Sequence, residues 1–97
     1  MKLFKGFEEE YKKRHNELWP ELKAILKEAG IENYSIFFDE MTQDLVGFYS
    51  VTNPEPLKNI PSNPVMKKWW TYMKDIMETN PDHSPKIFPL RELFFLL

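Results

Sequence analysis

Residues 10–22 have the sequence Glu-Tyr-Lys-Lys-Arg-His-Asn-Glu-Leu-Trp-Pro-Glu-Leu, which predicts a helix with polar side chains on its inward face. Tyr11 and His15 are four residues apart and therefore share one side of that helix. The same side continues, at spacings of three or four, with Leu18, Leu22, Ile25 and Ala29. A helix that only packs on a core would carry leucine or isoleucine at positions 11 and 15. A phenol and an imidazole can instead donate, accept and move protons, so this pair is the strongest functional signal in the chain.

Composition restricts the class of protein. A chain of 97 residues is large enough for one domain with a single core. A net charge of −2 and a pI near 5.7 argue against a nucleic-acid-binding surface. The sequence has no cysteine, which excludes thiolate catalysis and cysteine-ligated metals. No apolar run approaches the ~20 residues of a membrane span, and the first ten residues lack the apolar middle of a signal peptide. We expect a cytoplasmic protein.

The order of predicted elements is βαββαβ, the ferredoxin-like arrangement of an α+β protein. Lys2–Phe4 predicts a very short first strand. A helix is expected from Phe7 to Ala29, with Pro20 kinking it or splitting it after Trp19. Two strands, Asn33–Asp39 and Leu45–Val51, are expected to form an antiparallel hairpin. Residues 52–63 contain three prolines and are expected to be mostly irregular. A second helix should run from Pro64 to about Met77, and a last strand over Phe88–Leu96.

Both faces of the predicted sheet carry apolar side chains. Tyr34, Ile36 and Phe38 alternate onto one face, and Phe37 points to the other. Two helices can cover only one of these faces, and the other would be an exposed apolar patch. We therefore expect a homodimer whose sheets pack face to face.

Several motifs have both a functional and a purely structural interpretation. Trp69 falls on the core stripe of the second helix, and Trp70 lies about 100° around from it, so we favour Trp70 as a pocket wall; two packing tryptophans are the alternative. The polar segment 79–85 suits a rim or a simple surface turn. A lone helical histidine is usually structural, but Tyr11 and Trp19 on either side of His15 favour chemistry. No spacing of histidines and carboxylates predicts a metal site, and no serine has the surroundings of a nucleophile.

Four motifs, in order, resemble the L-rhamnose mutarotase family over nearly the whole chain. They are residues 10–22, Asn33-Tyr34-Ser35-Ile36, the segment Trp69-Trp70-Thr71-Tyr72-Met73, and the loop Asn80-Pro81-Asp82-His83-Ser84-Pro85. The resemblance implies one mutarotase domain over residues 1–97, a dimeric α+β barrel without cofactor or metal, and L-rhamnose as the substrate. It also implies that His15 is the proton donor and that Tyr11, Tyr34, Trp69 and Trp70 contact the sugar.

The chain departs from the family pattern in three places. Relatives have several residues before the position of Met1, so we expect either a start upstream or a shortened first strand. His83 stands where asparagine is usual, and residues 53–56 are richer in proline than the helical segment expected there. None of these departures removes a residue assigned to chemistry.

Mutarotation needs one proton to reach the ring oxygen and another to leave the anomeric hydroxyl, which suits an imidazole at neutral pH. Two other classes stay open: a non-catalytic sugar-binding or regulatory module, and a small monooxygenase of the same fold.

Overall fold

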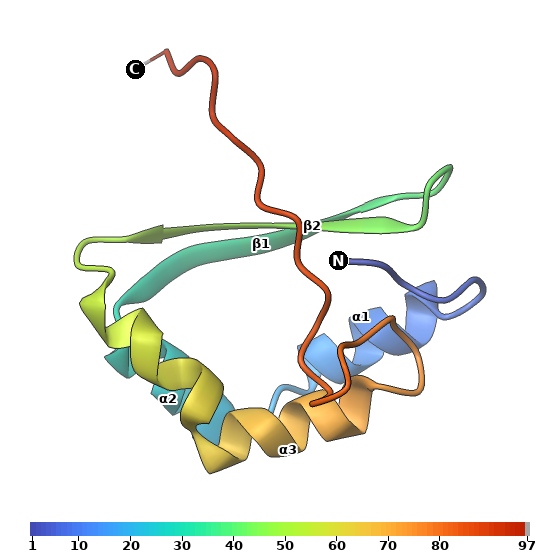
Figure 1. Ribbon diagram of the computed structural model, residues 1–97, viewed down its shortest axis with the longest axis horizontal. Helices are drawn as coiled ribbons and strands as arrows, with labels where there is room; N and C mark the ends of the chain where they lie inside the picture. Colours follow the sequence, from blue (N-terminus) through green and yellow to red (C-terminus); the bar gives the residue numbers. More distant parts are fainter. Residues whose placement is uncertain (97) are drawn as a thin grey trace.

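The computed structural model describes residues 1–96 as a small α+β fold in which the helices gather on one side of a two-stranded antiparallel sheet (Figure 1). The elements, in order, are α1 (Glu8–Asn16), α2 (Pro20–Glu28), β1 (Ile31–Asp39), β2 (Asp44–Val51), the 3-10 helix η1 (Glu55–Ser62) and α3 (Pro64–Met73). Within the described residues, none of these helices is both long enough and apolar enough to cross a membrane.

The long helix expected over 7–29 is split, as Pro20 predicts. Trp19 is extended, with ψ at 132°, because the ring of a following proline disfavours the helical conformation. Pro20 then occupies the first turn of α2, where its missing N–H costs nothing. The break begins earlier than the proline requires: α1 ends at Asn16, and the Leu18 N–H turns back to the His15 carbonyl. The split sets α1 at its own angle to the rest of the fold.

The hairpin confirms the two central strands to within two residues at each end. Phe38 pairs with Leu45 and Asp39 with Asp44, and Gln43 in the tight turn takes a positive φ of 67°. The predicted first strand is reduced to bridges: Lys2 pairs with Asp44. The N-terminal segment is nevertheless tied to β2, because Leu45 N–H donates to the Met1 carbonyl at 2.8 Å.

Three predictions for the second half of the chain are wrong. Residues 55–62 form the 3-10 helix η1 rather than an irregular segment. The first turn of a helix tolerates proline, and short helical segments often use i+3 hydrogen bonds. The second helix ends at Met73, not Met77, and Met77 instead bridges Leu3. Phe88–Leu96 is not a strand in this single chain. It leads away past the hairpin (Figure 1), and residues 88–96 form no ladder with another described segment.

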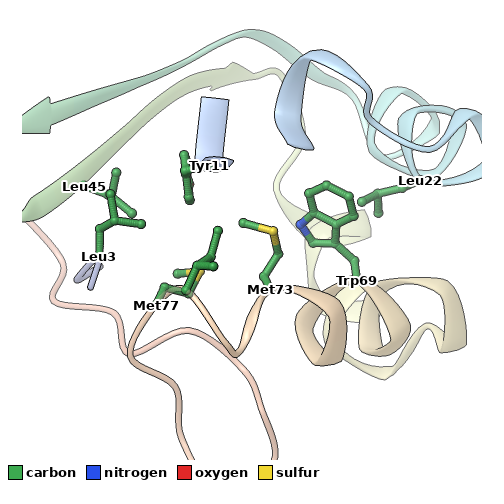
Figure 2. Close-up of a cluster of buried hydrophobic side chains, with 8 residues drawn as sticks. Leu3, Tyr11, Leu22, Leu45, Trp69, Met73 and Met77 are labelled. Carbon is green, nitrogen blue, oxygen red and sulfur yellow. The ribbon is translucent and has the colours of Figure 1, made fainter. Parts of the chain in front are cut away.

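The core lies between the hairpin and the helices and includes the first residues of the chain (Figure 2). Leu22 and Ile76 are its most completely buried side chains. The buried cluster as a whole consists of Leu3, Tyr11, Leu22, Leu45, Trp69, Met73, Ile76 and Met77. The predicted place of Trp69 on the core stripe of α3 is thus confirmed, and Met73 lies beside it in the core. One member of this cluster, Tyr11, carries a phenol hydroxyl, so the buried cluster includes a polar group.

Candidate active site

A cavity of about 640 Å³ opens beside the core, between α1, the hairpin and α3. This volume suits a small molecule. Aromatic and apolar side chains form most of its wall, and polar groups come mainly from α1. Its lining residues include Glu8, Glu9, Tyr11, Lys12, His15, Asn16, Tyr34, Ile36, Phe38, Leu45, Met66 and Trp69.

His15 projects into this cavity with a defined orientation. Its Nδ1 lies 3.0 Å from the Tyr11 carbonyl oxygen, one turn earlier in α1. Because a carbonyl only accepts, Nδ1 carries the proton in the neutral ring and Nε2 keeps the free lone pair. The Tyr11 ring stacks on the imidazole at 4.2 Å, and the Trp69 ring meets it edge-on at 5.4 Å. The imidazole is therefore held on two sides, with one basic nitrogen available.

Burial governs the protonation of these groups. It lowers the pKa of His15 below the ordinary value of 6.5, an effect only partly offset by the hydrogen bond to the Tyr11 carbonyl. The imidazole is consequently neutral at pH 7. Burial also raises the pKa of Tyr11 far above 10, and the nearby Tyr34 adds to this effect. The phenol of Tyr11 therefore stays protonated and can donate a hydrogen bond.

Tyr34 reaches the cavity through a bulge in β1. Glu32 pairs with Ser50 and Ser35 with Phe48, so Asn33 and Tyr34 together oppose the single residue Tyr49. The extra residue is accommodated by Asn33, whose φ is 53°, a conformation that asparagine tolerates better than most side chains.

The Tyr34 ring stacks on Tyr49 at 5.3 Å, and its hydroxyl crosses Gly47. A Cβ at position 47 would lie 3.3 Å from that oxygen, so glycine there leaves room for the phenol.

The two adjacent tryptophans of α3 have different surroundings. Trp69 is 5% exposed and belongs to both the core and the cavity wall, as its position between Met73 and Leu22 shows (Figure 2). Trp70 is half-buried against the core and does not line this cavity. Trp19, one turn beyond His15, packs edge-on against Trp69 at 5.1 Å. The structure thus brings together Tyr11, His15, Tyr34 and Trp69, and leaves Trp70 outside.

The segment 79–85 forms a tight loop beside α3 rather than part of the cavity wall. Thr79 bridges Pro85, and Asn80 N–H donates to the Ser84 carbonyl at 2.7 Å. His83 has a φ of 72°, and its Nδ1 lies 3.2 Å from Thr71 Oγ1. Over residues 1–96, no cluster of three or more histidines and carboxylates is arranged to hold a metal ion.

Four polar wall residues, namely Glu8, Glu9, Lys12 and Asn16, were not singled out from the sequence. Two of them, Lys12 and Asn16, directly follow the predicted pair. They are four apart in α1 and adjoin Tyr11 and His15, so the same helical spacing locates them. Charged and amide side chains are, however, common on exposed helical faces, and nothing in the pattern distinguishes these two from solvated residues.

Comparison with known proteins agrees with this geometry. Residues 1–96 match the sequence model of the L-rhamnose mutarotase family. The chain is 52% identical over 96 residues to an L-rhamnose mutarotase of Flavobacterium johnsoniae, a match that covers 99% of this chain and 90% of the relative. An L-rhamnose mutarotase of Agrobacterium fabrum is also 52% identical, with the same coverage. The crystal structure of an L-rhamnose mutarotase from Formosa agariphila superposes with a TM-score of 0.91 at 48% identity and covers 99% of this chain and 92% of that one.

The fold and the cavity define a small α+β protein with an aromatic-walled pocket and one oriented imidazole. Within that class, the chain belongs to the L-rhamnose mutarotase family.

Proposed function

We propose that this chain is an enzyme, an L-rhamnose mutarotase, that interconverts the α and β anomers of the sugar by general acid–base catalysis at His15. The observation that carries the proposal is the imidazole itself: it is half-buried, contacts two aromatic rings, keeps a single basic nitrogen and lines a cavity of small-molecule size. The family membership supplies the sugar, since the named relatives are L-rhamnose mutarotases.

In the proposed reaction, Nε2 of neutral His15 accepts the proton of the anomeric hydroxyl. The bond between the anomeric carbon and the ring oxygen breaks, the electron pair moves to the ring oxygen, and that oxygen takes a proton from water. The aldehyde turns about its C1–C2 bond. On closing, the hydroxyl oxygen attacks the other face of the carbonyl carbon and gives its proton back to the hydroxide left from that water, while the imidazolium returns its proton to O1. His15 is thus base in opening and acid in closing. Tyr11, whose pKa is raised by burial, orients the ring rather than supplying the proton.

Aromatic side chains are proposed to hold the sugar beside His15. Trp69 and Tyr34 line the cavity, and their flat faces suit the C–H-rich face and the methyl group of a 6-deoxy sugar. Tyr34 also presents its hydroxyl, which burial keeps protonated by raising its pKa, as a hydrogen-bond donor. Trp70 stays a predicted sugar contact, although the cavity of the single chain does not reach it.

The protonation state of His15 predicts an acidic limb in the pH–rate profile. The active form is the neutral imidazole, and burial lowers its pKa below 6.5, so kcat/KM for anomer exchange should lie on its plateau at pH 8 and fall to half of that plateau only below pH 6.5. The measurement is exchange by NMR between pH 5 and 8, with the enzyme-free rate subtracted at each pH. An acidic limb centred above pH 7 would assign the titrating group to something other than His15.

We further propose that the fold is completed as a ferredoxin-like, dimeric α+β barrel by a second copy. The pairings found in one chain support the order of such a sheet: the segment at Met77 bridges Leu3, and Lys2 bridges β2, all antiparallel. The outer face of the hairpin is apolar and open, with Phe37 and Phe48 62% and 65% exposed. The segment beyond Lys86 exposes further large apolar groups, namely Ile87, Phe88, Leu90, Leu93, Phe94, Phe95 and Leu96. A second copy would cover both surfaces.

The dimer proposal predicts that a charge on the outer hairpin face prevents assembly. Phe48→Glu should elute as a monomer of about 11.7 kDa in light scattering coupled to gel filtration, because the carboxylate would be buried without a partner. Met41→Glu is the matched control: it adds the same charge at the fully exposed hairpin turn and should leave the dimer intact. A wild-type monomer, or a dimeric Phe48→Glu, would contradict the proposed interface.

The catalytic proposal is tested by saturation-transfer NMR on L-rhamnose, in which irradiation of one anomeric proton lowers the signal of the other when the anomers exchange. Binding of the sugar without faster exchange would instead favour a non-catalytic sugar-binding module. The cytoplasmic location expected from the sequence stays a prediction.

A further inference from the structure

Arg14 precedes His15 in α1 and does not line the cavity. Its side chain is only 10% exposed, although arginine usually reaches solvent. Its guanidinium lies instead at the C-terminal end of α3, where the Arg14 carbon Cζ is 4.3 Å from the centre of the Tyr72 ring. Nothing in the reaction proposed above uses this residue.

The polar contacts of Arg14 join two helices that each contribute to the site. Nη1 donates to the Tyr72 carbonyl oxygen at 2.7 Å, and Nη1 and Nη2 together contact both oxygens of Asp75 at 3.0 and 3.2 Å. The Tyr72 carbonyl is in the last turn of α3, where helical carbonyls lack a partner and favour a cation. Among residues 1–96, every side-chain hydrogen bond between α1 and this end of α3 comes from Arg14.

The same region carries the aromatic contacts that hold the imidazole. His15 meets Trp69 edge-on, Trp69 lies 5.7 Å from Tyr72, and Trp19 contacts both of these rings. A continuous chain of ring contacts therefore leads from His15 through Trp69 to Tyr72. Arg14, the neighbour of His15 in sequence, packs on Tyr72 at the other end of that chain. Since α1 has only nine residues, it is marginal as an isolated helix and takes its position from such contacts.

We infer that Arg14 is a positioning residue for the mutarotase reaction: by fixing the C-terminal turn of α3 to α1, it sets the imidazole of His15 against Trp69 and the bound sugar. This inference rests on the function proposed above. The arrangement suits arginine rather than lysine, because a planar guanidinium can bind a carboxylate with two hydrogen bonds and lie over a ring at the same time. Hydrogen bonds from Arg14 lower the pKa of Asp75, so the ion pair persists over the pH range in which His15 titrates.

Arg14→Met removes the charge and the hydrogen bonds while keeping a long apolar stem. Displacing a catalytic group by about 1 Å can cost on the order of 100-fold in rate, so we expect kcat for anomer exchange to fall about 10- to 100-fold. The KM for L-rhamnose should change less than about threefold, because Arg14 does not contact the cavity. Arg14→Lys, which keeps the charge, should lose less activity than Arg14→Met. Lys13→Met is the matched control: it removes one charge from an exposed position in the same helix and should leave kcat within about twofold of wild type.

Coupling to His15 distinguishes positioning from general support of the fold. In a double-mutant cycle, Arg14→Met should have no further effect on exchange once His15 is alanine. The Hε1 proton of His15 provides a readout independent of activity, since its chemical shift depends on the ring currents of Tyr11 and Trp69. That signal should move in Arg14→Met and stay in place in Lys13→Met.

If Arg14→Met does not fold, Asp75→Asn takes its place, because Asp75 is 62% exposed and can be changed without burying a new group. Asp75→Asn removes the ion pair with Arg14 but leaves the hydrogen bond from Arg14 to the Tyr72 carbonyl, so it should lower kcat about threefold or more. Folded variants with wild-type kcat and an unmoved Hε1 signal would overturn the inference. Failure of the wild-type protein to accelerate exchange would instead overturn the proposed function, and the Hε1 shift would still decide whether Arg14 positions His15.

Discussion

Replacing His15 by alanine is expected to reduce enzyme-catalysed anomer exchange to near the rate in plain water. A positioned acid–base group contributes typically ~10²–10⁴ in rate, and the cavity offers no second imidazole, because His83 lies on the loop beside α3. The protein should stay folded, since His15 is only half-buried. The measurement is saturation-transfer NMR at saturating L-rhamnose, with circular dichroism to verify the fold.

His83→Ala is the control for this experiment. His83 interacts with Thr71 at the surface and has a positive φ, so its removal should leave exchange close to wild type. A folded His15→Ala protein with near wild-type exchange would remove His15 from the chemistry. Equal losses in both variants would show that the two histidines have been ranked wrongly.

Replacing Trp69 by alanine is expected to damage both stability and binding. The side chain is 5% exposed and packs among Leu22, Met73 and Trp19, so truncation should lower the free energy of unfolding by about 3–5 kcal/mol. The same ring forms part of the cavity wall and contacts His15, so the affinity for L-rhamnose should fall as well. Urea unfolding measures the loss of stability. A fluorescence titration with the sugar measures the affinity, in buffer without urea and at a low temperature at which the variant is folded.

Trp70→Ala is the matched variant at the next position. Trp70 is half-buried, so its truncation should cost distinctly less stability than that of Trp69. If Trp70 contacts the sugar, as predicted from the sequence, affinity should weaken while the fold persists. Unchanged affinity in Trp70→Ala, with weakened affinity in Trp69→Ala, would restrict the aromatic wall to the ring that the single-chain cavity contains.

Local chemistry accounts for the parts of the fold that the sequence predicts. Pro20 prevents one continuous helix from running through position 20, so the helix is split there. The β-branched and aromatic residues on either side of a tight turn form the hairpin. The last segment shows the limit of such reasoning. The apolar residues of 88–96 fit a strand, but a strand exists only where another backbone is available to pair with it. In one chain the neighbour of Leu3 is Met77 instead.

The candidate site, too, was predicted from the sequence only in part. Helical spacing placed Tyr11 and His15 on one inward face, and the structure finds both there. Spacing did not determine how the two side chains interact: they stack, and the hydrogen bond goes to the Tyr11 carbonyl rather than its hydroxyl. Nor could it determine which tryptophan lines the cavity, since that depends on how α3 is rotated against the core.

Arg14 shows why contacts between residues far apart in the sequence cannot be predicted from local sequence patterns. Its i,i+4 ion pair with Glu10 is visible from the spacing and is typical of a solvated helix face. The partner that gives the residue its role, Asp75, lies 61 positions further along the chain. Only the packing of α1 against the end of α3 brings the two groups together.

The most direct test of the account is saturation transfer between the anomeric protons of L-rhamnose with catalytic amounts of the wild-type protein at pH 7. The account predicts that irradiating one anomer strongly reduces the signal of the other, that the effect scales with protein concentration, and that it disappears in His15→Ala. An exchange rate equal to that of the sugar in buffer, from a folded protein that binds L-rhamnose, would contradict it.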